Sequence, residues 1–231
     1  MSGRLITVEG LDGSGKTTQI RLLEQTLRER GVPFRKVKFP VYDQPFSAAA
    51  RMYLNGEFGS DPDDVNAYAA STFFAVDRFA SYRTMWREDY EDGMTILADR
   101  YTTSNMIYQL PKLPSDEWEP FLRWLRDLEY GKMGLPEPAL TIYLDMPINF
   151  SQKLLEKRYS RSGGQKDIHE RDTAYLSVCR KSALFVAERL GWSVISCLEK
   201  DRLRSVGSIQ TEISGLVFRA LASEKAGNTN D

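Results

Sequence analysis

The chain has little cysteine and histidine and almost no net charge. Its 231 residues include two cysteines, Cys179 and Cys197, and one histidine, and the cysteines stand in no CxxC or other paired spacing. This scarcity argues against a disulfide framework or a zinc site and fits a reducing compartment. The 31 Lys and Arg residues nearly balance the 32 Asp and Glu residues. No overall basic field is therefore expected to attract nucleic acid or an anionic membrane, and an anionic ligand must be bound locally.

Long hydrophobic runs are also missing. No stretch approaches about 18 apolar residues, and the apolar run near the N-terminus is too short for a signal peptide. We therefore expect a cytoplasmic protein that neither enters a membrane nor is secreted. The length and the 42% hydrophobic content predict one domain over residues 1–222, followed by the polar tail SEKAGNTND (223–231).

Strand-like and helix-like segments alternate along the chain. Short β-rich or buried-type runs occupy residues 4–9, 34–39, 94–99, 141–145 and 192–197. Helical patterns occur at 17–30, at 46–56 and at about 62–90, and Asp61 is the expected N-cap of the last one. This order predicts an α/β fold in which a parallel sheet of about five strands is flanked by helices.

The first β-rich run leads into a glycine-rich loop, GLDGSGKTT. The loop matches G-x-x-x-x-G-K-[ST], with a strand expected before it and a helix after it. Glycines let backbone N–H groups turn toward an anion, Lys16 adds charge for the β and γ phosphates, and the Thr17 hydroxyl can ligate Mg²⁺. The expected nucleotide-binding residues are Gly10, Leu11, Asp12, Gly13, Ser14, Gly15, Lys16, Thr17 and Thr18. The loop alone does not separate kinases from ATPases or GTP switches.

A second polar position follows the buried run TILAD. Asp99 is expected at the carboxyl end of that strand, beside the phosphate loop, where it would be a second Mg²⁺ ligand. Alternatively, Asp99 only caps the next helix. Arg100 and Tyr101 come next, where a GTP switch would continue toward D-x-x-G, and no N-K-x-D signature occurs. A switch protein is therefore disfavoured.

The long helical pattern offers a ring and a guanidinium four residues apart. Phe74 and Arg78 share one face, whereas Phe73, Val76 and Ala80 are expected to face the core. A planar base can stack on the ring and hydrogen-bond to the guanidinium. The alternative is a solvated arginine beside a phenylalanine of a satellite core.

Further candidates for an acceptor site cluster after Asp99 and after the second strand. They are Arg100, Ser104, Asn105 and Tyr108 at helical spacing, together with Phe39. Arg100 can bind a phosphate, and Asn105 can offer a donor and an acceptor to a base edge. Two neighbouring phosphate sites predict phosphoryl transfer between nucleotides, in which positioning and charge neutralisation dominate catalysis.

A charged, glycine-containing stretch at about 158–171 interrupts two helical patterns and is expected to form a mobile surface loop. Its Arg158, Arg161 and Lys166 can close over the transferring group and exclude water. The only histidine, His169, is expected to be structural rather than catalytic.

These segments resemble those of the thymidylate kinase family, which phosphorylates dTMP with ATP. The resemblance rests on VEGLDGSGKTTQ (8–19), FFAVDR (73–78), ADRYTTSN (98–105) with Tyr108, YLDMP (143–147) and DIHE (167–170). It implies the fold of P-loop NTPases with a mobile lid, ATP and dTMP as substrates, dTDP and ADP as products, and Mg²⁺ as cofactor. It also suggests a homodimer.

The resemblance further implies roles for individual residues. Phe74 would stack on thymine, while Arg78 and Asn105 would hydrogen-bond its edge. Arg100 would bind the dTMP phosphate, and Tyr108 would lie near the 2′ position of the sugar. Two carboxylates complete the set, because Asp12 would lie between the acceptor and the metal, and Glu170 would reach the acceptor from the lid.

Two departures from the family pattern affect the cations. Residues 11–14 include no Arg or Lys, so the catalytic set of Asp12, Lys16 and Arg100 must be completed from the lid, with Arg161 as first choice and Lys166 or Arg158 as alternatives. The family often has an arginine shortly after the second strand, where this chain has PVYDQP (40–45) and Tyr42 can substitute only in part.

Other functions remain open at this point. Another nucleoside or nucleoside-monophosphate kinase of the same fold would keep the phosphate loop and the lid but need different groups at the base edge. A P-loop ATPase or regulatory switch would have no small acceptor, and an idle anion-binding protein would not turn over ATP.

Overall fold

The computed structural model describes residues 2–162 and 168–222, except for the side chains at 158, 161, 162, 170 and 171. Its centre is a parallel sheet with the strand order β2-β3-β1-β4-β5. The strands are β1 (Leu5–Gly10), β2 (Phe34–Lys38), β3 (Thr95–Asp99), β4 (Leu140–Asp145) and β5 (Ser193–Ser196). Each lies within about a residue of a run predicted from the sequence, so the predicted five-stranded parallel sheet is confirmed.

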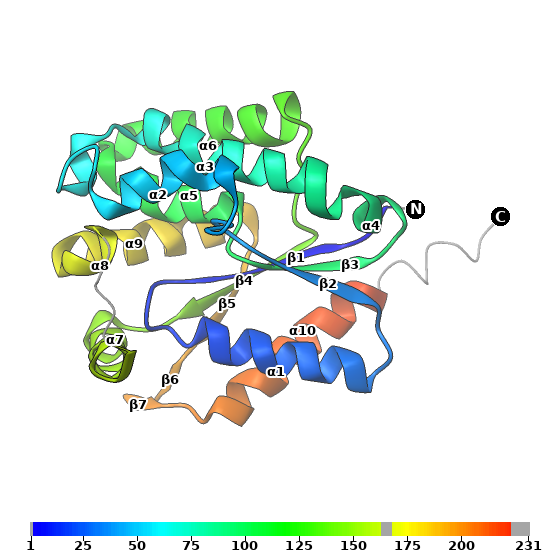
Figure 1. Cartoon of the computed structure of the whole chain (residues 1–231). Coiled ribbons are helices and arrows are strands. Elements are labelled where there is room, and N and C mark those ends of the chain that lie inside the picture. The colour runs from blue at the N-terminus through cyan, green and yellow to red at the C-terminus, as the bar shows by residue number, and fades with distance from the viewer. Residues whose placement is uncertain (1, 163–167, 223–231) are drawn as a thin grey trace.

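Helices cover both faces of this sheet (Figure 1). Their bounds are α1 (Lys16–Glu29), α2 (Ala48–Asn55), α3 (Ala67–Ser81), α4 (Arg87–Glu91), α5 (Thr102–Gln109), α6 (Trp118–Arg126), α7 (Ile148–Ser162), α8 (Ile168–Arg171), α9 (Thr173–Leu190) and α10 (Val206–Ala222). α1 and α10 lie on one face, whereas α2 to α6 and α9 form the opposite layer. β6 (Leu198–Glu199) and β7 (Arg202–Leu203) form a short antiparallel hairpin between β5 and α10.

The first strand is buried along its whole length, and its successive side chains point to opposite faces of the sheet. Ile6 packs with Leu23 of α1 in the core beneath the sheet. Leu5 points to the other face and packs with Trp86. Glu9 is on the same side as Leu5 by this alternation and is fully buried. A carboxylate is thus carried to the carboxyl end of the sheet on the side of α5.

The predicted helix over 62–90 is wrong as a single element. Asp61 caps only a 3₁₀ turn, Pro62–Asp64, by accepting a hydrogen bond from the Asp63 amide at 2.9 Å. Val65 is extended, and Asn66 is the true N-cap of α3, since its side chain accepts from the Ala69 amide. A π-helical turn, Tyr82–Trp86, then separates α3 from α4.

The predicted faces of this helix are also wrong in part. Val76 is 49% exposed, although it was expected to face the core, whereas Arg78 is 1% exposed. The buried side of α3 faces α5, with which α3 makes close contacts. Tertiary packing therefore places the arginine inside, where it requires a buried partner.

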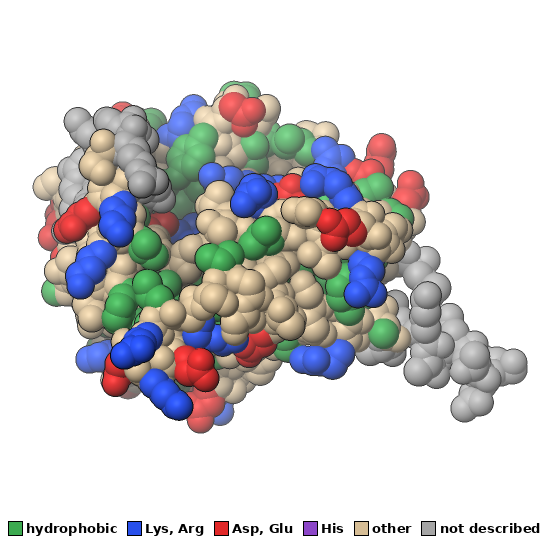
Figure 2. Space-filling view, turned by 90° about the horizontal axis from the view of Figure 1, so that it is seen from below, with side chains coloured by type: hydrophobic (Ala, Val, Ile, Leu, Met, Phe, Trp, Pro, Cys, Tyr) green, Lys and Arg blue, Asp and Glu red, His purple; other side chains and the backbone are tan. Residues whose placement is uncertain are grey.

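The surface agrees with the balanced composition. On the face that carries α1 and α10, basic and acidic side chains are interspersed, with no extended area of one charge (Figure 2). Among the described residues, no helix is long and apolar enough to cross a lipid bilayer.

Candidate active site

The phosphate loop connects β1 to α1 and owes its course to glycine. Gly13 and Gly15 have φ values of 78° and 88°, in the left-handed region. A Cβ at Gly10 would lie 2.6 Å from the Ser14 hydroxyl, and one at Gly13 would collide with the Ser151 carbonyl. A Cβ at Gly15 would meet nothing within 4 Å, so the start of α1 opens onto free space. Backbone N–H groups at such a helix start can bind phosphate.

Lys16 is folded back into this loop. Its Nζ donates hydrogen bonds to the carbonyls of Gly10 at 2.6 Å and Leu11 at 3.2 Å, and lies 4.0 Å from Asp12 Oδ1. Burial and the nearby Arg100 guanidinium lower the pKa of Lys16 to about 8. The ammonium is therefore still mostly protonated at neutral pH and available to an anion in the loop.

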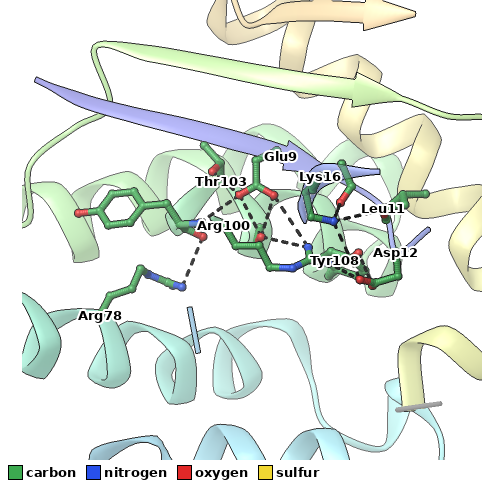
Figure 3. Close-up of polar contacts among 11 residues, drawn as sticks. Glu9, Leu11, Asp12, Lys16, Arg78, Arg100, Thr103 and Tyr108 are labelled. Carbon is green, nitrogen blue, oxygen red and sulfur yellow. Dashed lines mark hydrogen bonds and ion pairs between the residues drawn. The ribbon is translucent and has the colours of Figure 1, made fainter. Parts of the chain in front are cut away.

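Arg100 joins the phosphate loop to the start of α5 (Figure 3). Its Nη2 donates to Asp12 Oδ1 at 2.6 Å, and its guanidinium lies over the Tyr108 ring, 5.2 Å from the centroid. Tyr108 donates from its hydroxyl to the other Asp12 oxygen at 3.0 Å. Burial alone would raise the pKa of Asp12, but Arg100 and Lys16 outweigh it and hold this pKa well below its usual range. Asp12 is thus an ionised link between the two halves of the site.

Glu9 is a residue of this site that the sequence analysis missed. Its Oε1 accepts from the Tyr101 amide at 3.1 Å and from the Thr103 and Ser104 hydroxyls at 2.7 and 2.9 Å (Figure 3). The Arg100 Nη1 lies 4.0 Å from its other oxygen. Burial raises the pKa of Glu9, and Arg100 opposes that shift. The available signal was a charged residue in a strand of mainly apolar residues. The contacts of Glu9 fix the backbone around Arg100, whose φ of 69° is unusual for a residue other than glycine.

A cavity of about 350 Å³ lies beside Asp12 and Arg100. Eight of the nine residues predicted to bind the acceptor line it, namely Asp12, Phe39, Phe74, Arg78, Arg100, Ser104, Asn105 and Tyr108. The side chain of the ninth, Glu170, lies outside the described residues. The structure also brings in Lys38, Gln109 and His169, which the sequence analysis did not assign to the pocket, and Tyr42, which it expected to replace an arginine of the family in part. Segments that are distant in the sequence therefore form one pocket.

Lys38 adds a cation at this pocket. It occupies the last position of β2, in register with Asp99 of β3. It is exposed, and its side chain makes no hydrogen bond or ion pair with the described residues. Its ammonium is therefore uncommitted on the wall that also includes Arg100.

The opposite end of the pocket carries Arg78 and Asn105, both fixed by one buried carboxylate. Glu129 accepts two hydrogen bonds from Arg78 at 2.6 Å each and one from Asn105 Nδ2 at 3.2 Å. Asn105 Nδ2 also donates to the Ser71 carbonyl at 3.1 Å. Phe74 contributes a ring to the same pocket and meets Tyr53 edge-on, with 5.9 Å between centroids. No local sequence pattern marked Glu129, which lies in a π-helical segment, Asp127–Lys132.

The stretch expected to be a mobile loop is largely helical where it is described. α7 continues to Ser162, and α8 begins at Ile168, so the expectation of an irregular loop is wrong for these residues. Residues 163–167, with Lys166 among them, and the side chains of Arg158 and Arg161 lie outside the described residues. The choice of lid cation therefore stays a prediction.

His169 of α8 is buried against the pocket. Its ring stacks on Tyr108 and Tyr175, with centroids 5.1 and 5.5 Å away, and its Nε2 lies 2.9 Å from the Tyr53 hydroxyl. Burial and the neighbouring Lys112 lower the pKa of His169 to about 3. The imidazole is therefore neutral at physiological pH, and it packs α8 against the tyrosines that border the pocket.

Two oxygen-bearing side chains could help to hold a divalent cation. Thr17 lies exposed in the first turn of α1, and Asp99 is buried at the end of β3, close enough to Lys16 to oppose the fall of its pKa. The described part of the chain contains no cluster of three or more His, Cys, Asp or Glu that could hold a metal by itself. This donor set fits Mg²⁺, which prefers oxygen ligands and is usually completed by phosphate oxygens and water.

Comparisons with known proteins agree with this geometry. A family model described as "Thymidylate kinase" matches residues 8–204. The chain is 31% identical over 172 residues to thymidylate kinase of Mycobacterium tuberculosis, covering 73% of this chain and 78% of that one. It is 26% identical over 216 residues to a probable thymidylate kinase of Pyrococcus abyssi, covering 94% and 100%. The structure of thymidylate kinase from Candida albicans has the same fold, with a TM-score of 0.68 at 21% identity, covering 94% of this chain and 92% of that one.

Proposed function

Because the chain belongs to the thymidylate kinase family, we infer that it transfers the γ-phosphoryl group of ATP to dTMP, giving dTDP and ADP. One observation carries this inference at the level of the site. A phosphate loop and a separate aromatic pocket are joined by the ion pair between Asp12 and Arg100 at 2.6 Å. A donor and an acceptor phosphate can therefore meet at this pair.

ATP is proposed to bind through residues 10–18. The backbone of the glycine loop and the start of α1 face the phosphates, and Lys16 moves from the loop carbonyls onto the β and γ phosphates. Thr17 and Asp99 are proposed to hold Mg²⁺ together with phosphate oxygens. When bound, the cation neutralises charge on the phosphates.

dTMP is proposed to fill the aromatic pocket. Phe74 offers its ring to thymine, and Arg78 with Asn105 meets the base edge at the end where Glu129 holds them. The dTMP phosphate lies toward Arg100 and Lys38. Tyr108, which already contacts Asp12, borders the sugar.

The chemistry then needs little acid–base help from the protein. An ionised oxygen of the dTMP phosphate attacks the γ phosphorus of ATP, and the bond from that phosphorus to the β–γ bridging oxygen breaks, which leaves ADP. Lys16, Arg100 and a lid cation, with Arg161 as first choice, neutralise the charge that spreads over the transferring group. Asp12 remains ionised and orients Arg100.

A homodimer and a cytoplasmic location are further proposals. Met52 of α2 and Val76 and Phe79 of α3 are apolar and between 37% and 49% exposed on adjacent helices, which supports burial against a second copy. Cys179 and Cys197 are free, buried thiols, which supports a reducing compartment.

The activity is tested by ADP release from ATP and Mg²⁺ with dTMP, dUMP, AMP, GMP or thymidine added singly. We expect fast release with dTMP, weaker release with dUMP and background release with the other three. Equal release with AMP or GMP would assign the fold to another nucleotide. ADP release that ignores every acceptor would identify an ATPase.

A further inference from the structure

The two side chains expected at the base edge share one partner outside the pocket lining. Arg78 comes from α3 and Asn105 from α5, yet both donate to the carboxylate of Glu129. We propose that Glu129 is a positioning residue that sets the orientation of both groups and thereby the enzyme's selection of the base. This proposal rests on the proposed function of the pocket.

The geometry of the arginine carries the first step. The carboxylate of Glu129 accepts hydrogen bonds from the Nε and Nη2 of Arg78, each at 2.6 Å. Since a guanidinium is planar, two fixed nitrogens determine the plane of the third. The third nitrogen, Nη1, has only a long contact of 3.5 Å to the Tyr101 carbonyl. Its two N–H groups, together with the second N–H of Nη2, are left to donate to a ligand.

The carboxylate also fixes the asparagine. Asn105 Nδ2 donates to Glu129 and to the Ser71 carbonyl, so both hydrogens of the amide are committed. The amide oxygen of Asn105 is thereby left to accept a hydrogen bond. Glu129 thus leaves only donors on Arg78 and one acceptor on Asn105, which matches the adjacent O4 acceptor and N3–H donor of thymine. Cytosine presents the opposite pair at these positions, an amine and a bare N3.

No other described carboxylate pairs with Arg78. Asp77, its neighbour in the chain, accepts from the Ser47 hydroxyl and from the Val41 amide. Glu129 itself is fully buried, and the Thr102 hydroxyl donates to it at 2.8 Å. Removal of its charge therefore leaves a buried guanidinium without a carboxylate in hydrogen-bond contact, which favours a different orientation of the side chain.

The test compares dTMP with 5-methyl-dCMP, which keeps the methyl group, sugar and phosphate and inverts the base edge. In Glu129→Gln one acceptor oxygen becomes an NH₂ group, which cannot accept from Arg78. We expect kcat/KM for dTMP to fall about tenfold or more, relative to kcat/KM for 5-methyl-dCMP, while KM for ATP stays within about twofold. The matched control is Glu137→Gln, since Glu137 is exposed and, among the described residues, forms its ion pair with Arg126 at the surface. This control should change neither the ratio of kcat/KM for dTMP to kcat/KM for 5-methyl-dCMP nor the KM for ATP.

A double-mutant cycle separates positioning from general destabilisation. If Glu129 acts through Arg78 and Asn105, the selectivity loss from Glu129→Gln should be much smaller in an Arg78→Met background, where only the effect through Asn105 is left. If Glu129→Gln does not fold, Thr102→Val removes one anchor of the carboxylate at nearly constant volume and should shift selectivity in the same direction, by a smaller factor.

Three results would overturn the proposal: unchanged selectivity in folded Glu129→Gln, unchanged selectivity in Thr102→Val, or additive losses in the cycle. The wild-type assay keeps the proposed function separate. If the wild type prefers a nucleotide other than dTMP, the proposed function fails, and the same variants measured with that nucleotide still test positioning by Glu129.

Discussion

Replacement of Arg100 by methionine tests the electrostatic link at the centre of the site. The change keeps an unbranched side chain but removes the partner of Asp12 at 2.6 Å and the cation 4.0 Å from Glu9. Glu9 is fully buried and Asp12 is 20% exposed, so two carboxylates lose their nearest guanidinium in a poorly solvated region. Loss of one partner of a buried pair costs about 3–5 kcal/mol, and we expect about 3 kcal/mol at pH 7 because Asp12 keeps some water.

The same change should depend on pH, and the sign follows from the pKa shifts. In the wild type, Asp12 has a lowered pKa, so its contribution to stability is present above the unfolded value near about 4 and is lost as the pH falls toward the folded value. In Arg100→Met that contribution is gone, and Glu9, whose pKa burial already raises, becomes harder to ionise. Both effects make the wild type more stable than the variant at neutral pH. Both effects fade as the carboxylates take up protons.

Urea unfolding at pH 7 and at pH 4 measures this difference directly. We expect the gap in free energy of unfolding to be smaller at pH 4 than at pH 7, because the buried carboxylates of the variant take up protons over this range, while the Asp12 contribution of the wild type is lost only at lower pH. Arg87→Met is the matched control, because Arg87 pairs with Glu91 on the surface and its loss should change the stability far less than the loss of Arg100. A gap that is the same at both pH values would refute the electrostatic argument and leave only lost packing. The variant should also bind dTMP more weakly, which calorimetry with dTMP alone can show.

Two further predictions concern Lys38 and His169. Lys38→Met should raise the Kd for dTMP about tenfold but leave the Kd for thymidine unchanged, because only dTMP carries the phosphate. Lys36→Met is the control, since Lys36 pairs with Glu24. Equal losses of affinity for both ligands would contradict the placement of the phosphate at Lys38. His169 has a pKa near 3 when folded, so only the unfolded chain takes up a proton as the pH falls from 7 to 5. Urea unfolding should show the wild type losing about 2 kcal/mol more than His169→Asn over that range, and parallel losses would mean that the imidazole is not buried and neutral.

The local motifs were predictable because each depends on neighbours in the chain. The phosphate loop, the strands and the sequence from Asp99 to Tyr108 are read from spacing and alternation, and the structure places Phe39, Phe74 and Arg100 around one pocket as expected. The carboxyl ends of neighbouring parallel strands lie at the same edge of a sheet, so the order of segments was enough to bring these positions together.

The buried carboxylates were not predictable in the same way. Glu129 stands 51 residues from Arg78 and 24 from Asn105, and only the packed fold shows that the three side chains meet. The exposed Val76 had a similar cause, since an apolar residue on a helix reads as core until the neighbouring elements are known. The capping signal at Asp61 was genuine but was satisfied by a three-residue turn rather than by α3.

The contacts of Asp12 with both Arg100 and Lys16 have a consequence for how the binding of one substrate affects the binding of the other. Arg100 and Lys16 both interact with this carboxylate, and each is expected to bind a phosphate as well, one of dTMP and the other of ATP. Whichever nucleotide arrives first changes the charge that the other finds at its own cation. Any resulting change in ATP affinity must be returned, by the same factor, as a change in dTMP affinity. A single carboxylate thus couples the binding of the two substrates, and that coupling can be measured by titrating each nucleotide in the presence of the other.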